Sequence, residues 1–433
     1  MEFRVDSGQA ISGRCRVPGD KSISHRAVML AALADGESRF EGFLAGADTL
    51  ATAAAFRAMG VVIDGPHEGV LTVRGVGLGG LQAPAGPLDM GNAGTGMRLL
   101  AGLMAGQSFG VTLVGDASLS RRPMRRVMVP LRQMGADITA AEGDTPPLTL
   151  RPAADLHGID YVLPMASAQV KSCLLLAGLY ADGRTCVTEP APTRDHTERM
   201  LAAFGRPVQR DGACVCIEGG REPLRAVRFA IPGDISSAAF PLVAALIAAQ
   251  GEVLIENVGV NPTRTGILDI LRAMGADIAL ENPREAGAEP VADIRARSSA
   301  LRGIHVPEHL VPLAIDEFPA IAVAAACARG ETLITGAEEL RVKESDRIAA
   351  IANGLAALGI AVQALPDGLR ITGGDMRGGV VDSHGDHRIA MAFSLAGLRA
   401  AGPVRIRDCI NVGTSFPGYV ELMRGLGLPI EVA

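Results

Sequence analysis

The chain has 433 residues, of which 48% are hydrophobic, 20% charged and 3% aromatic, and its formal net charge is −6. This length exceeds what one hydrophobic core usually supports, so we expect two domains. The negative net charge argues against a nucleic-acid partner, since nucleic-acid-binding proteins are normally basic. The charged N-terminus and the lack of 18 uninterrupted apolar residues predict neither a signal peptide nor a membrane span, and therefore a cytoplasmic protein.

Two sequence patterns recur six times along the chain. The first is a polar or glycine-rich start followed by a run rich in Ala and Leu, and it begins at residues 18–22, 91–95, 165–169, 232–236, 315–319 and 385–388. The second is a glycine after a hydrophobic residue and before a short strand, at Gly60, Gly135, Gly205, Gly275, Gly359 and Gly427. These glycines are 75, 70, 70, 84 and 68 residues apart. Such spacing predicts an α/β fold built from six βαβαββ-like repeats.

The repeats also predict where the domains divide. Pro-Gly-Asp occurs at residues 18–20 and 232–234, which indicates two crossings between one domain at 18–232 and another at 1–17 plus 233–433. The six apolar runs should form buried central helices, with amphipathic helices and sheets outside them. Their polar starts carry unpaired backbone N–H groups that favour anions. We therefore expect the active site in a cleft between the domains, where these helix starts converge.

Cations cluster at several predicted helix starts. They are Lys21, Arg26, Arg121, Arg122, Arg125, Arg126, Arg341, Lys343, Arg347 and Arg388. Each cluster alone could be a solvated helix end, but their recurrence favours a site for a substrate with phosphate and carboxylate groups. Lys21 does not belong to a P-loop, because Asp20 separates it from Gly19. Asp316, at another helix start, can be an N-cap, a general base or both.

The seven cysteines are scattered through predicted helices and strands, and their number is odd. This pattern predicts no disulfide framework. Cys214 and Cys216 form a Cys-x-Cys pair within an alternating strand pattern. Because no second pair accompanies them, no metal site is expected there.

Seven motifs in chain order resemble those of the 5-enolpyruvylshikimate-3-phosphate synthases, also called 3-phosphoshikimate 1-carboxyvinyltransferases. They lie at residues 18–26, 91–98, 122–124, 167–172, 194–197, 341–347 and 386–388. The wording Ser-Ala-Gln-Val-Lys-Ser is similar to the second class of this family. The resemblance implies a two-domain inside-out α/β barrel whose domains close on substrate. It also implies transfer of the enolpyruvyl group of phosphoenolpyruvate to the 5-hydroxyl of shikimate 3-phosphate, with release of phosphate and without metal or cofactor. We expect a monomer that acts in the shikimate pathway.

The resemblance further assigns residues to substrates and chemistry. Shikimate 3-phosphate should be bound by Lys21, Ser22, Arg26, Ser167, Ala168, Gln169, Arg194, Asp316 and Lys343. Phosphoenolpyruvate should be bound by Lys21, Gly94, Arg122, Gln169, Arg347 and Arg388. Asp316 should take the 5-hydroxyl proton, Glu344 is the candidate donor to C3, and Lys21 should act near both ligands.

Two alternatives follow from the same features. The UDP-N-acetylglucosamine enolpyruvyl transferases share the sixfold fold but typically have Lys-Asn where this chain has Lys21-Ser22, and a reactive cysteine in the loop that corresponds to residues 115–122. A non-catalytic anion-binding repeat scaffold would not need Asp316 and Glu344 beside the cations. The chain departs from the first class at residues 413–414, where that class has a lysine, and at Glu339, where it has asparagine.

Overall fold

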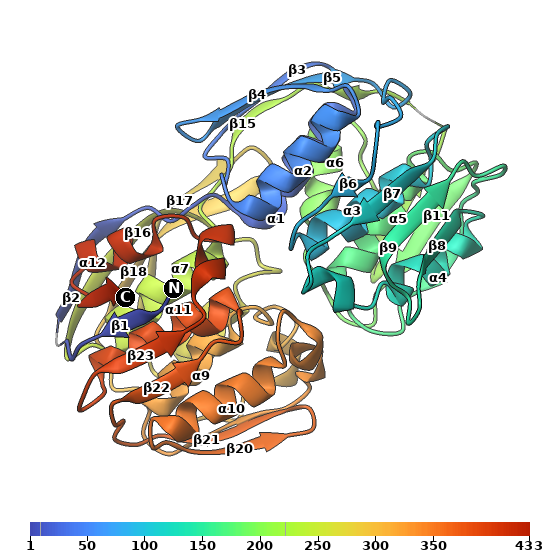
Figure 1. Ribbon diagram of the computed structural model, residues 1–433. Coiled ribbons are helices and arrows are strands. Elements are labelled where there is room, and N and C mark those ends of the chain that lie inside the picture. The colour runs from blue at the N-terminus through green and yellow to red at the C-terminus, as the bar shows by residue number, and fades with distance from the viewer. Residues whose placement is uncertain (9, 221) are drawn as a thin grey trace. The chain divides into compact units, whose positions relative to one another are not determined.

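A computed structural model describes residues 1–8, 10–220 and 222–433 (Figure 1). The chain forms two compact units. The N-terminal unit comprises Gly19–Ile231 and Ala286–Ala288, and the C-terminal unit comprises Met1–Pro18, Pro232–Glu285 and Glu289–Ala433. Among the described residues, no helix has both the length and the apolar character needed to cross a membrane.

The N-terminal unit contains the first three predicted apolar helices, and all three are largely buried. Helix α3 contacts both α1 and α5, and α1 packs against the sheet that contains β3 and β5 (Figure 1). The helices of this unit are α1 (Lys21–Ala32), α2 (Ala47–Ala58), α3 (Gly94–Met104), η1 (Leu119–Arg121), α4 (Arg125–Gln133), α5 (Ala168–Gly178) and α6 (His196–Ala203).

Three sheets complete the N-terminal unit, in the orders β14-β3-β5-β4 with β15 also on β3, β6-β7-β9-β8 and β10-β11-β13-β12. Each combines antiparallel pairs with a parallel strand at one side. The strands are β3 (Ala34–Glu41), β4 (Val62–His67), β5 (Val70–Val76), β6 (Leu88–Asp89), β7 (Val111–Val114), β8 (Asp137–Ala141), β9 (Thr145–Arg151), β10 (Asp160–Val162), β11 (Arg184–Thr188), β12 (Gln209–Asp211), β13 (Cys214–Glu218), β14 (Leu224–Arg225) and β15 (Arg228–Ala230).

The C-terminal unit contains the other three predicted apolar helices, and these contact one another in pairs: α7 with α9, α9 with α11 and α11 with α7. Every residue of α7 and α9 is buried, which explains why these helices are apolar on all sides. The helices of this unit are α7 (Ile235–Ile247), α8 (Gly266–Ala273), η2 (Glu308–Leu310), α9 (Phe318–Ala326), η3 (Glu338–Val342), α10 (Arg347–Ala357), α11 (His387–Leu395), η4 (Ala396–Leu398), η5 (Ile410–Thr414) and α12 (Tyr419–Gly425).

Its three sheets have the orders β22-β23-β1-β24, β17-β18-β16-β2 and β19-β21-β20. The strands are β1 (Phe3–Val5), β2 (Ala10–Cys15), β16 (Gln250–Gly259), β17 (Asp277–Ala286), β18 (Glu289–Arg297), β19 (Glu331–Ile334), β20 (Ala361–Leu365), β21 (Gly368–Thr372), β22 (Gly379–Asp382), β23 (Val404–Arg407) and β24 (Ile430–Val432). The α/β class predicted from the sequence is confirmed. In the described ranges the six sheets are open, each with a strand at either end, so no sheet closes on itself as a barrel.

The six repeated glycines all follow a helix. Each comes directly after the last helical turn of α2, α4, α6, α8, α10 or α12, and their φ angles lie between 82° and 107°. An L-residue is strained in that region, whereas glycine enters it freely and ends the helix. The repeat seen in the sequence is therefore a helix stop used six times.

One sequence prediction is wrong: the chain does contain a disulfide. Cys186 on β11 and Cys216 on β13 are joined, with an S–S distance of 2.07 Å. The two residues are 30 positions apart, but the antiparallel register of β11 and β13 sets them directly opposite each other. The sequence pattern gives the strands but not this register. The remaining cysteines are free.

Candidate active site

Side chains cap several of the buried helices at their N-terminal ends. Asp20 accepts a hydrogen bond from the Ile23 amide at 2.9 Å, and Asp386 accepts one from the Arg388 amide at 2.9 Å. Helix α3 differs, since it begins after Ala93, which has no polar side chain to cap it. Backbone N–H groups at such a start favour an anion.

Two arginines lie beside this uncapped start of α3. A Cβ atom placed on Gly94 would be 3.0 Å from Nη1 of Arg122 and 3.3 Å from Nη1 of Arg98. Arg122 also donates to Oγ of Ser118 at 3.3 Å and to the side-chain oxygen of Asn92. The structure thus brings together Gly94 and Arg122, both of which the sequence predicts to bind phosphoenolpyruvate.

Gln169, at the start of α5, joins three helices of the N-terminal unit. Its Oε1 accepts hydrogen bonds from Arg98 at 2.9 Å and from Arg126 at 3.2 Å, and its Nε2 donates to Thr95 at 2.9 Å. Neither Arg98 nor Arg126 was assigned to a substrate, although both lie in the charged or glycine-rich segments that pointed to the site. An arginine at a helix start, where the dipole disfavours it, is the signal that identifies them.

The first cluster of the sequence is tied into the protein at several points. Lys21 forms an ion pair with Asp48, whose side chain is nearly buried. Arg26 is 3% exposed and donates to Thr197 at 2.7 Å, to Ser172 at 2.8 Å and to the Ser22 carbonyl at 2.9 Å. Arg26 therefore connects α1 with α5 and α6.

His25 lies between these two cations in the sequence and is fully buried. Its Nδ1 is 2.8 Å from Oγ1 of Thr52. Burial, and then the charges of Lys21 and Arg26, hold the pKa of His25 well below its usual range. The imidazole is therefore neutral at physiological pH.

The start of α5 also carries an ion cluster that the sequence did not predict. Ser167 caps the helix by accepting from the Val170 amide at 3.4 Å, and Ala168 is the first helical residue. One turn further on, Lys171 is fully buried, with Nζ 2.9 Å from Glu189 and 2.6 Å from Glu198.

This ion cluster also reaches the loop before α6. Lys171 Nζ lies 3.5 Å from the Thr193 carbonyl, and the Thr193 hydroxyl donates to Glu189. The next residue is Arg194, a half-buried side chain predicted to bind shikimate 3-phosphate. The cluster thus holds the backbone that presents Arg194. In the sequence, this ion cluster is indicated by a lysine inside a predicted helix that has no other charged residue.

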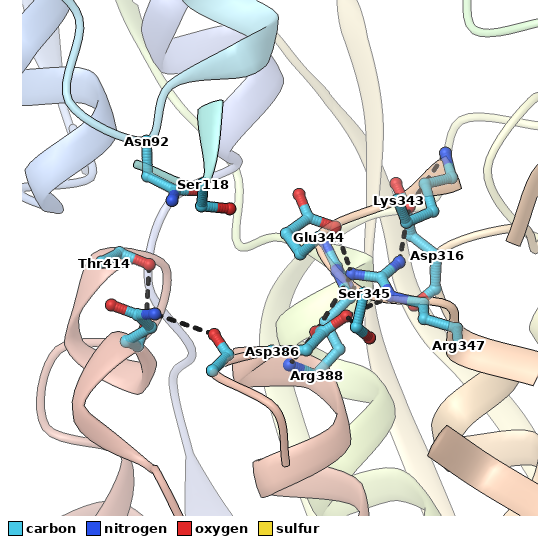
Figure 2. A network of polar contacts seen from close by, with 12 residues as sticks. Asn92, Ser118, Asp316, Lys343, Glu344, Ser345, Arg347, Asp386, Arg388 and Thr414 are labelled. Carbon is cyan, nitrogen blue, oxygen red and sulfur yellow. Dashed lines mark hydrogen bonds and ion pairs between the residues drawn. The ribbon is translucent and has the colours of Figure 1, made fainter. Parts of the chain in front are cut away.

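A second group of predicted residues meets in the C-terminal unit (Figure 2). Arg347 is fully buried and bonds three carboxylates: Asp386 at 2.8 Å, Glu344 at 2.7 Å and Asp316 at 3.3 Å. Lys343 lies 3.6 Å from the Asp316 carboxylate. These contacts place the predicted base between two cations.

Two further contacts complete this group. Arg388 donates to the Asp316 carbonyl at 3.3 Å, and Lys343 lies 3.2 Å from Glu339. Asp316 precedes α9 and is not its N-cap, a position occupied by Glu317. Of the two interpretations left open for Asp316, the structure thus removes the N-cap.

The pKa values of the buried pair follow from its charges. Burial alone would lower the pKa of Arg347, but Asp386, Glu344 and Asp316 together raise it above its usual range. Burial alone would raise the pKa of Asp386, but the adjacent Arg347 lowers it. Arg347 and Asp386 therefore stay charged across the physiological range. The motifs predicted Arg347 as a substrate ligand but not its contacts with three carboxylates.

Buried arginines and lysines at helix starts, with a carboxylate held among them, define an α/β protein suited to proton transfer on anionic substrates. Comparison with known proteins is more specific. The chain matches the family model described as EPSP synthase (3-phosphoshikimate 1-carboxyvinyltransferase) over residues 5–423, so it belongs to this family. The resemblance stated from seven motifs is confirmed, and the chain is a transferase.

Relatives and solved structures agree with this assignment. The chain is 67% identical to the 3-phosphoshikimate 1-carboxyvinyltransferase of Alkalilimnicola ehrlichii, over 99% of this chain and 96% of the relative. It is 64% identical to that of Methylococcus capsulatus, over 100% and 98%. The EPSP synthase structure from Acinetobacter baumannii matches with a TM-score of 0.89 and 53% identity, over 100% and 99%. The enolpyruvyl transferase NikO from Streptomyces tendae, at 20% identity and a TM-score of 0.80 over 99% and 98%, shares the fold.

Proposed function

We propose that the protein transfers the enolpyruvyl group of phosphoenolpyruvate to the 5-hydroxyl of shikimate 3-phosphate and releases phosphate. The observation that carries this proposal is the position of Asp316, 3.6 Å from Lys343 and 3.3 Å from Arg347. A carboxylate between cations can accept a hydroxyl proton while the cations hold an anionic substrate. The names of the family and of the relatives support the same reaction.

Shikimate 3-phosphate is bound, in this proposal, by Lys21, Ser22, Arg26, Ser167, Ala168, Gln169, Arg194, Asp316 and Lys343. The N-terminal end of α5, which Ser167, Ala168 and Gln169 form, offers backbone N–H groups to the phosphate. Arg26 orders the neighbouring start of α1 through its bonds to Ser172 and the Ser22 carbonyl.

Phosphoenolpyruvate is bound by Lys21, Gly94, Arg122, Gln169, Arg347 and Arg388. The close approach of Arg122 to Gly94 supports this assignment, since the missing Cβ leaves the helix start open to a phosphate or carboxylate. Charge-assisted hydrogen bonds of this kind contribute about 1.5–3 kcal/mol each.

The reaction proceeds in two steps. Asp316 accepts the proton of the 5-hydroxyl as its oxygen attacks C2 of phosphoenolpyruvate, and Glu344 protonates C3. The C2–O bond to phosphate then breaks and C3 returns a proton to Glu344, which restores the double bond. Glu344 accepts a hydrogen bond from Arg347 through Oε2 and must carry a proton in order to donate one to C3. The step needs no metal or organic cofactor, because fixed cations and helix ends stabilise the developing charge.

We also propose that the two groups of residues act on the same substrates, in a cleft between domains at residues 18–232 and at residues 1–17 plus 233–433. The boundaries of the two compact units support this division. Five of the six sheets join antiparallel pairs to a parallel strand, which supports repeated units arranged as an inside-out barrel. The proposed enzyme is a monomer. Because charged phosphate esters do not cross membranes unaided, we place it in the cytoplasm with its substrates.

Phosphate release from phosphoenolpyruvate tests the reaction and the base together. We expect release with shikimate 3-phosphate as acceptor, and a fall in kcat of about 10²–10⁴-fold in Asp316→Ala. Asp375→Ala, which removes an exposed carboxylate of the same unit, is the control and should keep full activity. Release only with UDP-N-acetylglucosamine would assign the chain to the related transferases. No release with either acceptor would leave an anion-binding scaffold.

A further inference from the structure

Three of the seven cysteines lie together on one sheet of the N-terminal unit. Cys186 on β11 is directly opposite Cys216 on β13, and Cys214 precedes Cys216 by two residues. Alternate residues of a strand point to the same face, so all three side chains share one face. Their sulfur atoms lie within 4.8 Å of one another, and those of Cys214 and Cys216 are 3.6 Å apart.

This face is the one turned away from the hydrophobic core. The alternating residues Val187, Val215 and Ile217 are buried in the core cluster that also contains α5. The cysteines therefore project from the opposite face of β11 and β13. Cys186 and Cys216 are buried there, whereas Cys214 is half-buried. None of the three belongs to the residues assigned to the substrates.

We propose that the reduced three-cysteine cluster Cys186, Cys214 and Cys216 binds one Zn²⁺ ion, with water as the fourth ligand. Zinc is bound tetrahedrally at about 2.3 Å from each thiolate, which requires sulfur atoms about 3.8 Å apart. The distance of 3.6 Å between Cys214 and Cys216 is close to that value, and the sulfur atoms of Cys186 and Cys216, which are 2.07 Å apart in the disulfide, separate when it is reduced. Thiolates prefer soft or borderline metals over Mg²⁺ and Ca²⁺.

A neighbouring arginine can offset the charge of the metal-bound cluster. Nε of Arg184 lies 3.1 Å from Sγ of Cys186, on the same strand. Three thiolates around one Zn²⁺ carry a net charge of −1, and the guanidinium offsets it.

The other free cysteines do not compete for the metal. Burial raises the pKa of Cys15, Cys173, Cys327 and Cys409 to about 12, so these side chains remain thiols at neutral pH. Among the described residues, these three cysteines also form the group of His, Cys, Asp or Glu side chains whose ligand atoms lie close enough together to hold a metal ion. Both observations favour this sheet as the place of a thiolate metal site.

The disulfide and the metal exclude each other. In the oxidised protein Cys186 and Cys216 are bonded to each other, and two of the three ligands are lost. A dithiol or phosphine reductant supplies two electrons that open the S–S bond and is itself oxidised. Binding of Zn²⁺ then displaces the three thiol protons. The redox state of one cysteine pair thus decides whether the site exists.

Cobalt is the probe for the experiment, because Co²⁺ occupies zinc thiolate sites and shows a sulfur-to-metal charge-transfer band. The full chain is reduced with a phosphine, freed of reductant under anaerobic conditions and titrated with Co²⁺. We expect a band that saturates at one equivalent, that Zn²⁺ abolishes, and that the oxidised chain lacks. Cys214→Ser should lose the band, whereas Cys15→Ser, which removes a half-buried thiol of the other unit, should keep it.

Native mass spectrometry of the wild-type chain provides a measurement that needs no variant. We expect one bound zinc in the reduced chain and none in the oxidised chain. Reduced wild-type protein without bound zinc and without the cobalt band would overturn the proposal. An equal band in Cys214→Ser and wild type would overturn it as well.

Discussion

Lys171 offers the sharpest test of how the N-terminal unit is stabilised. Its side chain is fully buried and forms ion pairs with two carboxylates, Glu189 and Glu198, whose side chains are 1% and 8% exposed. Lys171→Met keeps the length and the apolar stem of the side chain but removes its charge. Two carboxylates then remain together in a site that water does not reach.

The expected loss is large because the remaining charges cannot be solvated. Removing one partner of a buried ion pair costs about 3–5 kcal/mol. For a unit of this size, 1 kcal/mol corresponds to a shift of the melting temperature of about 2–4 °C. Lys171→Met should therefore lower the melting temperature of the N-terminal unit by about 6–20 °C. The Michaelis constant for shikimate 3-phosphate should also rise, since the cluster holds the residue before Arg194.

Calorimetry and urea unfolding measure this loss against two comparison variants. Arg74→Met breaks an ion pair of the same unit whose side chains are 71% and 44% exposed, so it should cost less than about 1 kcal/mol. Adding Glu189→Gln and Glu198→Gln to Lys171→Met removes the uncompensated charges and should restore most of the stability. A cost for Lys171→Met no larger than that for Arg74→Met, or no recovery in the triple variant, would refute the reasoning.

Three further predictions concern other buried groups. The folded-state pKa of His25 is lowered, so as the pH falls the unfolded chain binds a proton before the folded chain does, and the free energy of unfolding should fall by up to about 1.4 kcal/mol per pH unit below about pH 6.5. His25→Gln should reduce the pH dependence of the unfolding free energy, measured with urea between pH 7 and 5. The same pH dependence in the variant and the wild type would contradict this. In Gly94→Ala the new Cβ lies 3.0 Å from Arg122. The steady-state Michaelis constant for phosphoenolpyruvate should therefore rise about tenfold, equal to about 1.4 kcal/mol, while the Michaelis constant for the acceptor stays constant. An equal rise in the two Michaelis constants would argue against a local effect. The lowered pKa of Asp386 contributes stability that is present above about pH 4 and is lost as the pH falls through the folded-state pKa. Asp386→Asn should therefore be about 3–5 kcal/mol less stable than the wild type at pH 7, and its unfolding free energy should fall less on acidification. Unchanged stability at pH 7 would show that the pairing of Asp386 with Arg347 is dispensable.

Local sequence signals predicted much of the fold. The helix starts at Asp20, Ser167, Asp234 and Asp386 are capped by the side chains that the sequence shows there. Caps, helix stops and apolar runs depend on residues within a few positions of one another, so one sequence is enough to read them. The family motifs then identified the candidate site residues and assigned them to substrates.

Contacts between residues far apart in the chain could not be predicted from the sequence. The disulfide of Cys186 and Cys216 depends on the register of β11 against β13, and the partners of Lys171 lie 18 and 27 positions away. Nothing in a local pattern ties such residues together, since the fold alone brings them within reach. The same holds for Arg347, whose partner Asp386 is 39 residues distant.

Arg347 links the two functions proposed for this group of residues, which are substrate binding and proton transfer. Its guanidinium holds Asp316, Glu344 and Asp386, which come from three different segments of the C-terminal unit. Phosphoenolpyruvate, if bound there as proposed, competes with these carboxylates for the same positive charge. Asp386 is buried and bonds Arg347 through two nitrogens, whereas the Glu344 side chain is 24% exposed and is bonded through one. By its exposure and its single bond, Glu344 should be displaced more easily than Asp386 by a substrate bound as proposed. Glu344 is also the residue proposed to protonate C3, which only its protonated carboxyl group can do.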